Sequence, residues 1–165
     1  MDVPDGPDVA SALTFERFFD EHHGRLFSAL CAITGNRQEA EELTQEAFLR
    51  LWERWERVAS LDNPAGYLYR TAMNLFRKRL RRAKTAARKA IGLIESTDAF
   101  EAVDARETVV RGLRELSPPQ RAAVVLTNLR GFTSTEAAQM LGMDAGTVRA
   151  LASKGRSKMR KVVEA

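Results

Sequence analysis

Basic side chains near the carboxyl end of the sequence recur with the spacing of one helix face. The recurring positions, three or four residues apart, are Arg149, Ser153, Arg156 and Arg160. Residues 145–161 hold six basic residues and no acidic one. Such a face neutralises phosphates, and arginine also reads guanine through two hydrogen bonds. The alternative is the solvated basic helix of an ordinary bundle.

The residues that must position this face predict a helix–turn–helix. Thr133 and Glu136 fit a capping box at the start of a first helix. Gly142 fits its end, because glycine readily adopts a left-handed backbone, and Asp144 fits the cap of the second helix. That helix has an inward stripe of Val148, Ala152, Gly155 and Met159. A helix–turn–helix with a cationic outer face is typical of proteins that enter the DNA major groove.

Charge is unevenly distributed over the 165 residues. The net charge is +4 and the pI about 9.6. Residues 64–94 contain nine Arg or Lys and no acid, whereas residues 39–56 contain six Glu and two Arg. This asymmetry indicates two partners, one anionic and one not.

A second basic helix is predicted from Pro64, with Asn63 as its cap, to about Ala87. One side carries a polar row of Arg70, Asn74, Arg77 and Arg81. The row is a second candidate surface for nucleic acid. A helix lying on an anionic membrane is the rival interpretation, but the wide apolar face favours a packed bundle.

An acidic helix is predicted between Asn36 and about Val58. Its outer side carries Glu42, Glu46, Leu49 and Glu53. A leucine among carboxylates favours a docking surface for a basic partner, and a plain solvated face is the open alternative. Trp52 and Trp55 could stack on bases, but their helical spacing favours the core.

The composition excludes several functional classes. Cys31 is the only cysteine, so a disulfide framework is excluded and a reducing cytoplasm fits. Two histidines, His22 and His23, predict no metal site. No catalytic constellation or phosphate-binding glycine loop occurs, so we expect neither an enzyme nor a cofactor. No long apolar run occurs, so we expect no membrane insertion.

The pattern predicts an all-α protein of two small helical domains. The expected organisation is a disordered tail over residues 1–13, a first domain over 14–89, a linker over 90–104 and a second domain over 105–165. Further helices are expected over residues 14–34, 107–116 and 117–131. Phe19 of the first and Leu129 of the last are expected in the core.

Four stretches together resemble one known family. They are EAEELTQEAFLRLW, NPAGYLYRTAMNLFRKRLRR, LSPPQRAAVVL and GFTSTEAAQMLGMDAGTVRALASKGRSKMR. In this order they are similar to the conserved regions 2 and 4 of the extracytoplasmic-function (ECF) sigma factors, the small bacterial class that has only these two regions. The likeness spans most of the chain and is more specific than a helix–turn–helix alone.

The resemblance implies a transcription initiation factor that acts in the cytoplasm. Its partners would be promoter DNA and core RNA polymerase, through the clamp coiled coil of the largest subunit and the flap of the second. An anti-sigma factor usually restrains such proteins. The polymerase-binding residues would be Glu42, Gln45, Glu46, Leu49 and Glu53.

The resemblance also assigns two DNA surfaces. Ser60, Leu61, Asp62, Asn63, Arg70, Asn74, Arg77, Lys78 and Arg81 would open and hold the −10 element. Thr147, Arg149, Ala150, Ser153, Lys154, Arg156 and Arg160 would contact the −35 element. The linker would run through the polymerase active-site channel.

The recognition helix departs from the family pattern. Leu151, Ala152 and Ser153 stand where the family often has Arg, Leu and His or Phe. Gly155 replaces a common alanine, which should weaken the helix by roughly 1 kcal/mol. Two other functions remain: a sigma-like decoy that binds an anti-sigma factor, and a stand-alone helix–turn–helix repressor. The intact basic rows argue against the decoy.

Overall fold

The computed structural model describes residues 13–87 and 107–165, which are helical and contain no strand. In chain order the elements are α1 (Phe15–Thr34), α2 (Arg37–Glu53), α3 (Trp55–Ala59), α4 (Pro64–Ala87), α5 (Glu107–Arg114), α6 (Pro118–Val124), the π-helix η2 (Val125–Leu129), α7 (Ser134–Leu141) and α8 (Ala145–Glu164). The predicted all-α class is confirmed. The expected linker over residues 90–104, and residues 1–12 of the expected tail, lie outside the described residues.

Local capping signals place most helix ends. Thr14 caps α1 by accepting from the Arg17 amide at 3.2 Å, and Asn36 caps α2 by accepting from the Glu39 amide at 3.0 Å. Ser117 and Gln120 form a complete capping box at α6. Each cap satisfies amides that the helix itself leaves unpaired.

The acidic helix is shorter than predicted. It ends at Glu53, because Arg54 leaves the helical backbone at φ −123° and ψ 21°, and α3 begins at Trp55. The Trp55 ring then lies 5.3 Å from that of Phe18 and is partly buried. Trp52 is 56% exposed, so its expected place in the core is wrong. It lies one residue, or about 100° of helix rotation, beyond the buried Leu51.

The helix that begins at Pro118 widens into a π-helical turn before Gly131. The Arg130 amide donates to the Val125 carbonyl at 2.9 Å, a bond that spans five residues. The extra residue turns Leu129 off the buried stripe, and its side chain is 37% exposed, contrary to expectation. Phe19 is likewise 36% exposed on α1.

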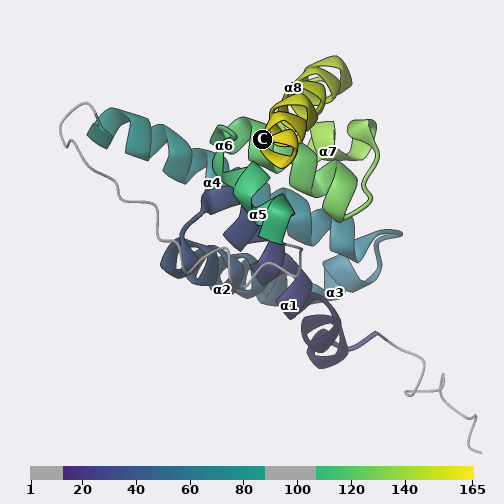
Figure 1. Ribbon diagram of the computed structural model, residues 1–165. Coiled ribbons are helices and arrows are strands. Elements are labelled where there is room, and N and C mark those ends of the chain that lie inside the picture. The colour runs from purple at the N-terminus through teal and green to yellow at the C-terminus, as the bar shows by residue number, and fades with distance from the viewer. Residues whose placement is uncertain (1–12, 88–106) are drawn as a thin grey trace, which may run out of the picture.

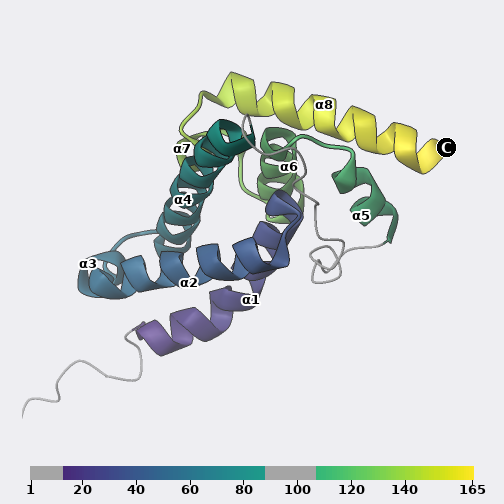
Figure 2. The same ribbon diagram turned by 90° about the vertical axis from the view of Figure 1, so that its left-hand side faces the viewer.

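The helices from both halves of the chain share one hydrophobic core. Figures 1 and 2 show α8 on the opposite side of the molecule from α1 and α2, with α4, α6 and α7 between them. α7 packs along α4, and α6 and η2 pack against α1. The two halves therefore meet over an extended contact, an arrangement that the sequence did not predict.

Candidate functional site

Asp144 fixes the start of the predicted recognition helix α8. Its Oδ1 accepts from the Thr147 amide at 2.8 Å and from the Thr147 hydroxyl at 3.1 Å. These hydrogen bonds lower the pKa of Asp144. Before it, Gly142 takes the left-handed conformation at φ 63°, and Thr133 with Glu136 forms a complete capping box on α7. The helix–turn–helix predicted from these signals is confirmed.

Every residue predicted to contact the −35 element lies on the exposed side of α8. These residues are Thr147, Arg149, Ala150, Ser153, Lys154, Arg156 and Arg160. The opposite stripe of Val148, Ala152 and Gly155 is buried. Arg156 Nη1 donates to Asn128 Oδ1 of η2 at 3.3 Å, and the neighbouring Lys158 donates to Gln120 Oε1 of α6 at 3.2 Å. The helix therefore presents a continuous cationic surface.

The predicted −10 loop connects α3 to α4 and is exposed throughout. Its residues are Ser60, Leu61, Asp62 and Asn63. Asn63 Oδ1 accepts from the Gly66 amide at 2.9 Å and so caps α4. A Cβ on Gly66 would come within 2.7 Å of Asn63 Nδ2. Glycine at position 66 therefore leaves room for the cap that holds this loop.

The polar row of α4 is only partly open to solvent. Arg70, Lys78 and Arg81 are exposed, whereas Asn74 and Arg77 are half-buried. Arg77 Nη2 donates to Asn74 Oδ1 at 2.6 Å, and its Nη1 lies directly against Gly142 of the helix–turn–helix. A cavity between the two halves joins the −10 loop to α7. It is lined by Leu61, Asn63, Gly66, Tyr67, Arg70, Glu136, Gln139 and Met140.

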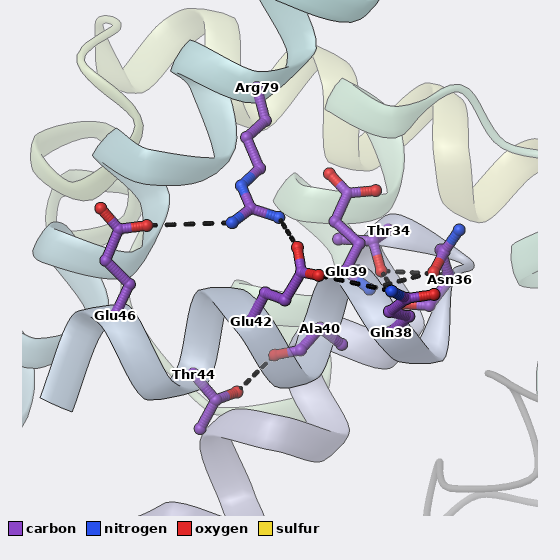
Figure 3. Close-up of polar contacts among 9 residues, drawn as sticks. All are labelled: Thr34, Asn36, Gln38, Glu39, Ala40, Glu42, Thr44, Glu46 and Arg79. Atoms are coloured by element: carbon purple, nitrogen blue, oxygen red, sulfur yellow. Dashed lines mark hydrogen bonds and ion pairs between the residues drawn. The ribbon is translucent and has the colours of Figure 1, made fainter.

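The acidic surface on α2 forms ion pairs with a cationic side chain of α4. Figure 3 shows Arg79 reaching across to two carboxylates, with Nη1 2.8 Å from Glu42 Oε2 and Nη2 3.8 Å from Glu46 Oε2. Glu46 also pairs with Arg50 at 3.1 Å, and Glu42 accepts from Gln38 at 3.5 Å. These two carboxylates are therefore already neutralised in part.

The far end of the same surface is open. Leu49 is 62% exposed, and Gln45 and Glu53 are also exposed. Trp52 adds a second large apolar group there. The five predicted polymerase-binding residues thus lie along one helix, with the paired acids toward its start and the apolar groups toward its end.

Three features of the site were missed by sequence reasoning. Arg79 was counted only as part of a basic run, and its partner Glu42 lies 37 positions away in the chain. Trp52 was expected in the core. An apolar groove on the second half of the chain was also missed. The groove is lined in part by Val109, Leu113, Leu129, Met159 and Val163. Its signal in the sequence was Val163, which lies four residues after Met159 and so continues the Gly155–Met159 stripe of α8.

Some chemistries have no counterpart in the described residues. Within residues 13–87 and 107–165 no group of three His, Cys, Asp or Glu could hold a metal ion. In the same ranges no helix is long and apolar enough to span a membrane. Burial raises the pKa of the Cys31 thiol to about 11, so this buried cysteine has little thiolate character at neutral pH.

Comparison with known sequences matches two family models in succession. Residues 18–86 match sigma-70 region 2, and residues 106–159 match sigma-70 region 4. The ECF RNA polymerase sigma factor SigE of Mycolicibacterium smegmatis is 29% identical over 93% of this chain, and SigL of Mycobacterium tuberculosis is 28% identical over 87%. The chain spans 63% of the first relative's length and 85% of the second's.

Solved structures share the fold over nearly the whole chain. The sigma factor RpoE of Bartonella quintana, solved in complex with the anti-sigma factor NepR, matches 91% of this chain and 96% of its own, with a TM-score of 0.71 and 18% identity. CnrH in complex with the cytosolic domain of CnrY matches 91% and 87%, with a TM-score of 0.59 and 21% identity. The likeness to both structures is one of fold.

Proposed function

The chain belongs to the ECF family of RNA polymerase sigma factors, and on this premise we propose that it binds core RNA polymerase and directs it to a particular set of promoters. It would act in the cytoplasm, where the polymerase transcribes. The proposed work is recognition and strand opening driven by binding energy, with no covalent chemistry.

The observation that carries this proposal is the exposed cationic face of α8. Seven predicted contact residues project from one capped helix whose other side is buried. A rigid helix that presents arginines outward suits the major groove. Arg149 and Arg156 are our candidates for contacts with bases or phosphates of the −35 element.

Strand separation is assigned to the −10 loop and α4. The loop offers the exposed Leu61 and polar side chains, and α4 supplies Arg70, Asn74 and Arg77. Unpaired bases are held by stacking and by hydrogen bonds to their edges, while cations attract the backbone. These residue types support capture of one separated strand near Leu61 and Arg70.

Polymerase docking is assigned to the outer side of α2. Leu49 adds apolar area at an exposed site, and Glu53 adds charge that attracts a basic coiled coil. The paired carboxylates of Glu42 and Glu46 support the same surface. The flap of the second large subunit is the proposed partner of the region 4 domain.

An anti-sigma factor is a further proposed partner. RpoE was solved in complex with the anti-sigma factor NepR, and CnrH in complex with the cytosolic domain of CnrY; both share this fold. We extend this kind of regulation to the present chain by family analogy. The decoy and the stand-alone repressor remain the competing functions, and neither requires promoter-dependent transcription.

Run-off transcription tests the proposed function. Purified bacterial core polymerase is given a pool of promoter fragments with the wild type, with Arg149→Ala plus Arg156→Ala, or with the control Arg17→Ala on α1. We expect discrete new transcripts with the wild type and the control, whose start sites share two spaced sequence boxes. The double variant should still bind polymerase but initiate poorly.

The outcomes separate the three functions. A stable polymerase complex with promoter-specific transcripts supports the sigma factor. No polymerase complex and no transcripts would refute it and favour the decoy or the repressor. Equal loss of polymerase binding and promoter binding in the double variant would show that α8 was assigned to the wrong partner.

A further inference from the structure

Each carboxylate oxygen of Glu42 and Glu46 already faces a donor from this chain. Arg79 Nη1 lies 2.8 Å from Glu42 Oε2, and Gln38 Nε2 donates to Glu42 Oε1 at 3.5 Å. Arg79 Nη2 lies 3.8 Å from Glu46 Oε2, and Arg50 Nη2 lies 3.1 Å from Glu46 Oε1. A cation that arrives on a binding partner therefore meets two carboxylates that are already paired.

Arg79 stands where a cation of the partner would contact both acids. Glu42 and Glu46 are four positions apart, so their side chains lie on the same side of α2. Figure 3 shows the guanidinium of Arg79, which comes from α4, between the two carboxylates. A basic side chain that projects from a partner helix would need the same oxygens. The internal cation and an external one therefore require the same place.

The internal pairing weakens the attraction that this part of the surface exerts on a basic partner. Glu42 and Glu46 carry two negative charges, and Arg79 and Arg50 beside them carry two positive charges. A cation that approaches Glu42 is attracted by the carboxylate and repelled by the guanidinium next to it. Solvent reaches these groups, since the side chains of Arg79 and Glu42 are 29% and 51% exposed. The pair is therefore open to exchange with another cation.

Arg79 also acts on a third carboxylate of α2. Burial raises the pKa of Glu39, the charge of Arg79 opposes this rise, and the charge of Glu42 adds to it. One guanidinium thus offsets the repulsion among Glu39, Glu42 and Glu46. If Arg79 turned away with nothing in its place, this repulsion would return. Its departure is therefore favoured only when another cation replaces it.

We propose that Arg79 is an internal competitor of the polymerase for Glu42 and Glu46, and that docking exchanges one cation for another. A basic side chain of the polymerase takes the carboxylate oxygens, and Arg79 turns toward solvent. This inference rests on the proposed function, because the competing cation belongs to the proposed docking partner. The competition makes the surface selective. A protein that offers positive charge alone gains little from the paired acids, whereas a partner that also covers Leu49 gains apolar contact that favours the exchange.

The test compares variants of α4 that change one positive charge. Arg79→Gln removes the competitor, and Arg79→Lys keeps its charge. Arg82→Gln is the matched control, because Arg82 is exposed three positions further along the same helix. Fluorescence anisotropy and stopped-flow mixing measure binding to core polymerase and to a short oligolysine peptide, which offers charge without an apolar surface. Both probes are used at low and at high salt, and circular dichroism with thermal unfolding checks that each variant is folded.

We expect Arg79→Gln to bind core polymerase about two- to fivefold more tightly, mainly through faster association, because it releases two carboxylates. It should also bind oligolysine more tightly, and both gains should shrink at high salt. Arg79→Lys should stay near the wild type, and Arg82→Gln should gain less with either probe. Equal gains in Arg79→Gln and Arg82→Gln would overturn the proposal. A weaker polymerase complex of folded Arg79→Gln would also overturn it, and would show that Arg79 positions the acids for the partner.

Glu42→Gln completes a double-mutant cycle with Arg79→Gln. In the wild type it removes a carboxylate that Arg79 already neutralises, so the affinity for polymerase should change by less than about twofold. In the Arg79→Gln background the same change should remove most of the gain, and equal effects in both backgrounds would contradict competition for Glu42. Polymerase that binds none of these proteins would refute the proposed function and this inference with it. Polymerase binding with unchanged oligolysine affinity in Arg79→Gln would refute the inference alone.

Discussion

Gly155 shows how a neighbour reverses what helix propensity predicts. Considered alone, glycine within α8 weakens the helix by roughly 1 kcal/mol relative to alanine. In the fold, a Cβ at this position would lie 2.7 Å from Val124 Cγ2 and 3.4 Å from Leu116 Cδ1. Glycine at position 155 therefore allows α8 to pack closely on α6. The lower helix propensity of glycine is the cost of this close packing.

We expect Gly155→Ala to destabilise the protein by about 1 kcal/mol, because overpacking costs roughly 1–3 kcal/mol and exceeds the gain in helix propensity. Gly24→Ala is the matched control. Gly24 is exposed in the middle of α1, and a Cβ there meets nothing within 4 Å. That variant should gain about 1 kcal/mol. Urea unfolding measures both, and stabilisation by both changes would show that α8 does not pack on Val124 as described.

Asp144 gives α8 a dependence on pH. Hydrogen bonds from Thr147 lower its pKa below the ordinary value of 3.8. Its stabilising effect is therefore complete above pH 3.8 and is lost as the pH falls through the lower folded value. Asp144→Asn keeps an oxygen that can cap the helix but removes the titration.

The difference in free energy of unfolding between the wild type and Asp144→Asn should be constant near neutral pH and should shrink below pH 3.8. Chemical denaturation across this range measures it. Asp20→Asn on α1 calibrates the general effect of losing one negative charge. A difference that stays constant to the lowest pH at which both proteins fold would contradict a role for the Asp144 carboxylate in capping.

At the scale of elements, the sequence predicted those helix ends that residues within one turn of the end determine. Thr133, Gly142 and Asp144 each act within one helical turn, so their types and spacing were sufficient to place α7 and the start of α8. The break at Arg54 carries no such signal. Neither glycine nor proline stands there, and the next helix is set by packing of Trp55 against α1.

The acidic surface of α2 shows the same limit. The spacing of Glu42, Leu49 and Glu53 on one helix face was readable, because it is local to that helix. The pairing of Glu42 with Arg79 was not, since it depends on how α4 lies across α2. The surface therefore has two parts. In one, Glu42 and Glu46 form ion pairs with Arg79; in the other, Leu49 and Glu53 are exposed to solvent.

The two parts should respond differently to substitution. Leu49→Ala plus Glu53→Lys should weaken the polymerase complex about tenfold or more without lowering the melting temperature, because both side chains are exposed. Glu42→Lys should lower the melting temperature, because it sets a cation beside Arg79. Fluorescence anisotropy with core polymerase and thermal unfolding measure these effects. Wild-type affinity in the first variant would remove polymerase docking from this surface.

At the scale of the molecule, the relation between the two halves depends on contacts far apart in the sequence. Arg130 and the carbonyl it binds are 105 positions apart. Periodicity and capping carry no information about such pairs. The sequence therefore predicted two helical units and their surfaces, but not that α7 would lie on α4 and share its core.

The shared core predicts that the two halves unfold together. Each is small, and both contribute buried residues to one core through the contacts of α4 with α7 and of α1 with α6; small units are marginal alone. Calorimetry should give one transition for the wild type. Arg130→Gln should split it into two, because the bond to the Arg25 carbonyl and the contact with Tyr69 are lost. Arg25→Gln keeps the carbonyl and should keep one transition. Two transitions in the wild type would show that the halves fold independently and that their contact contributes little to stability.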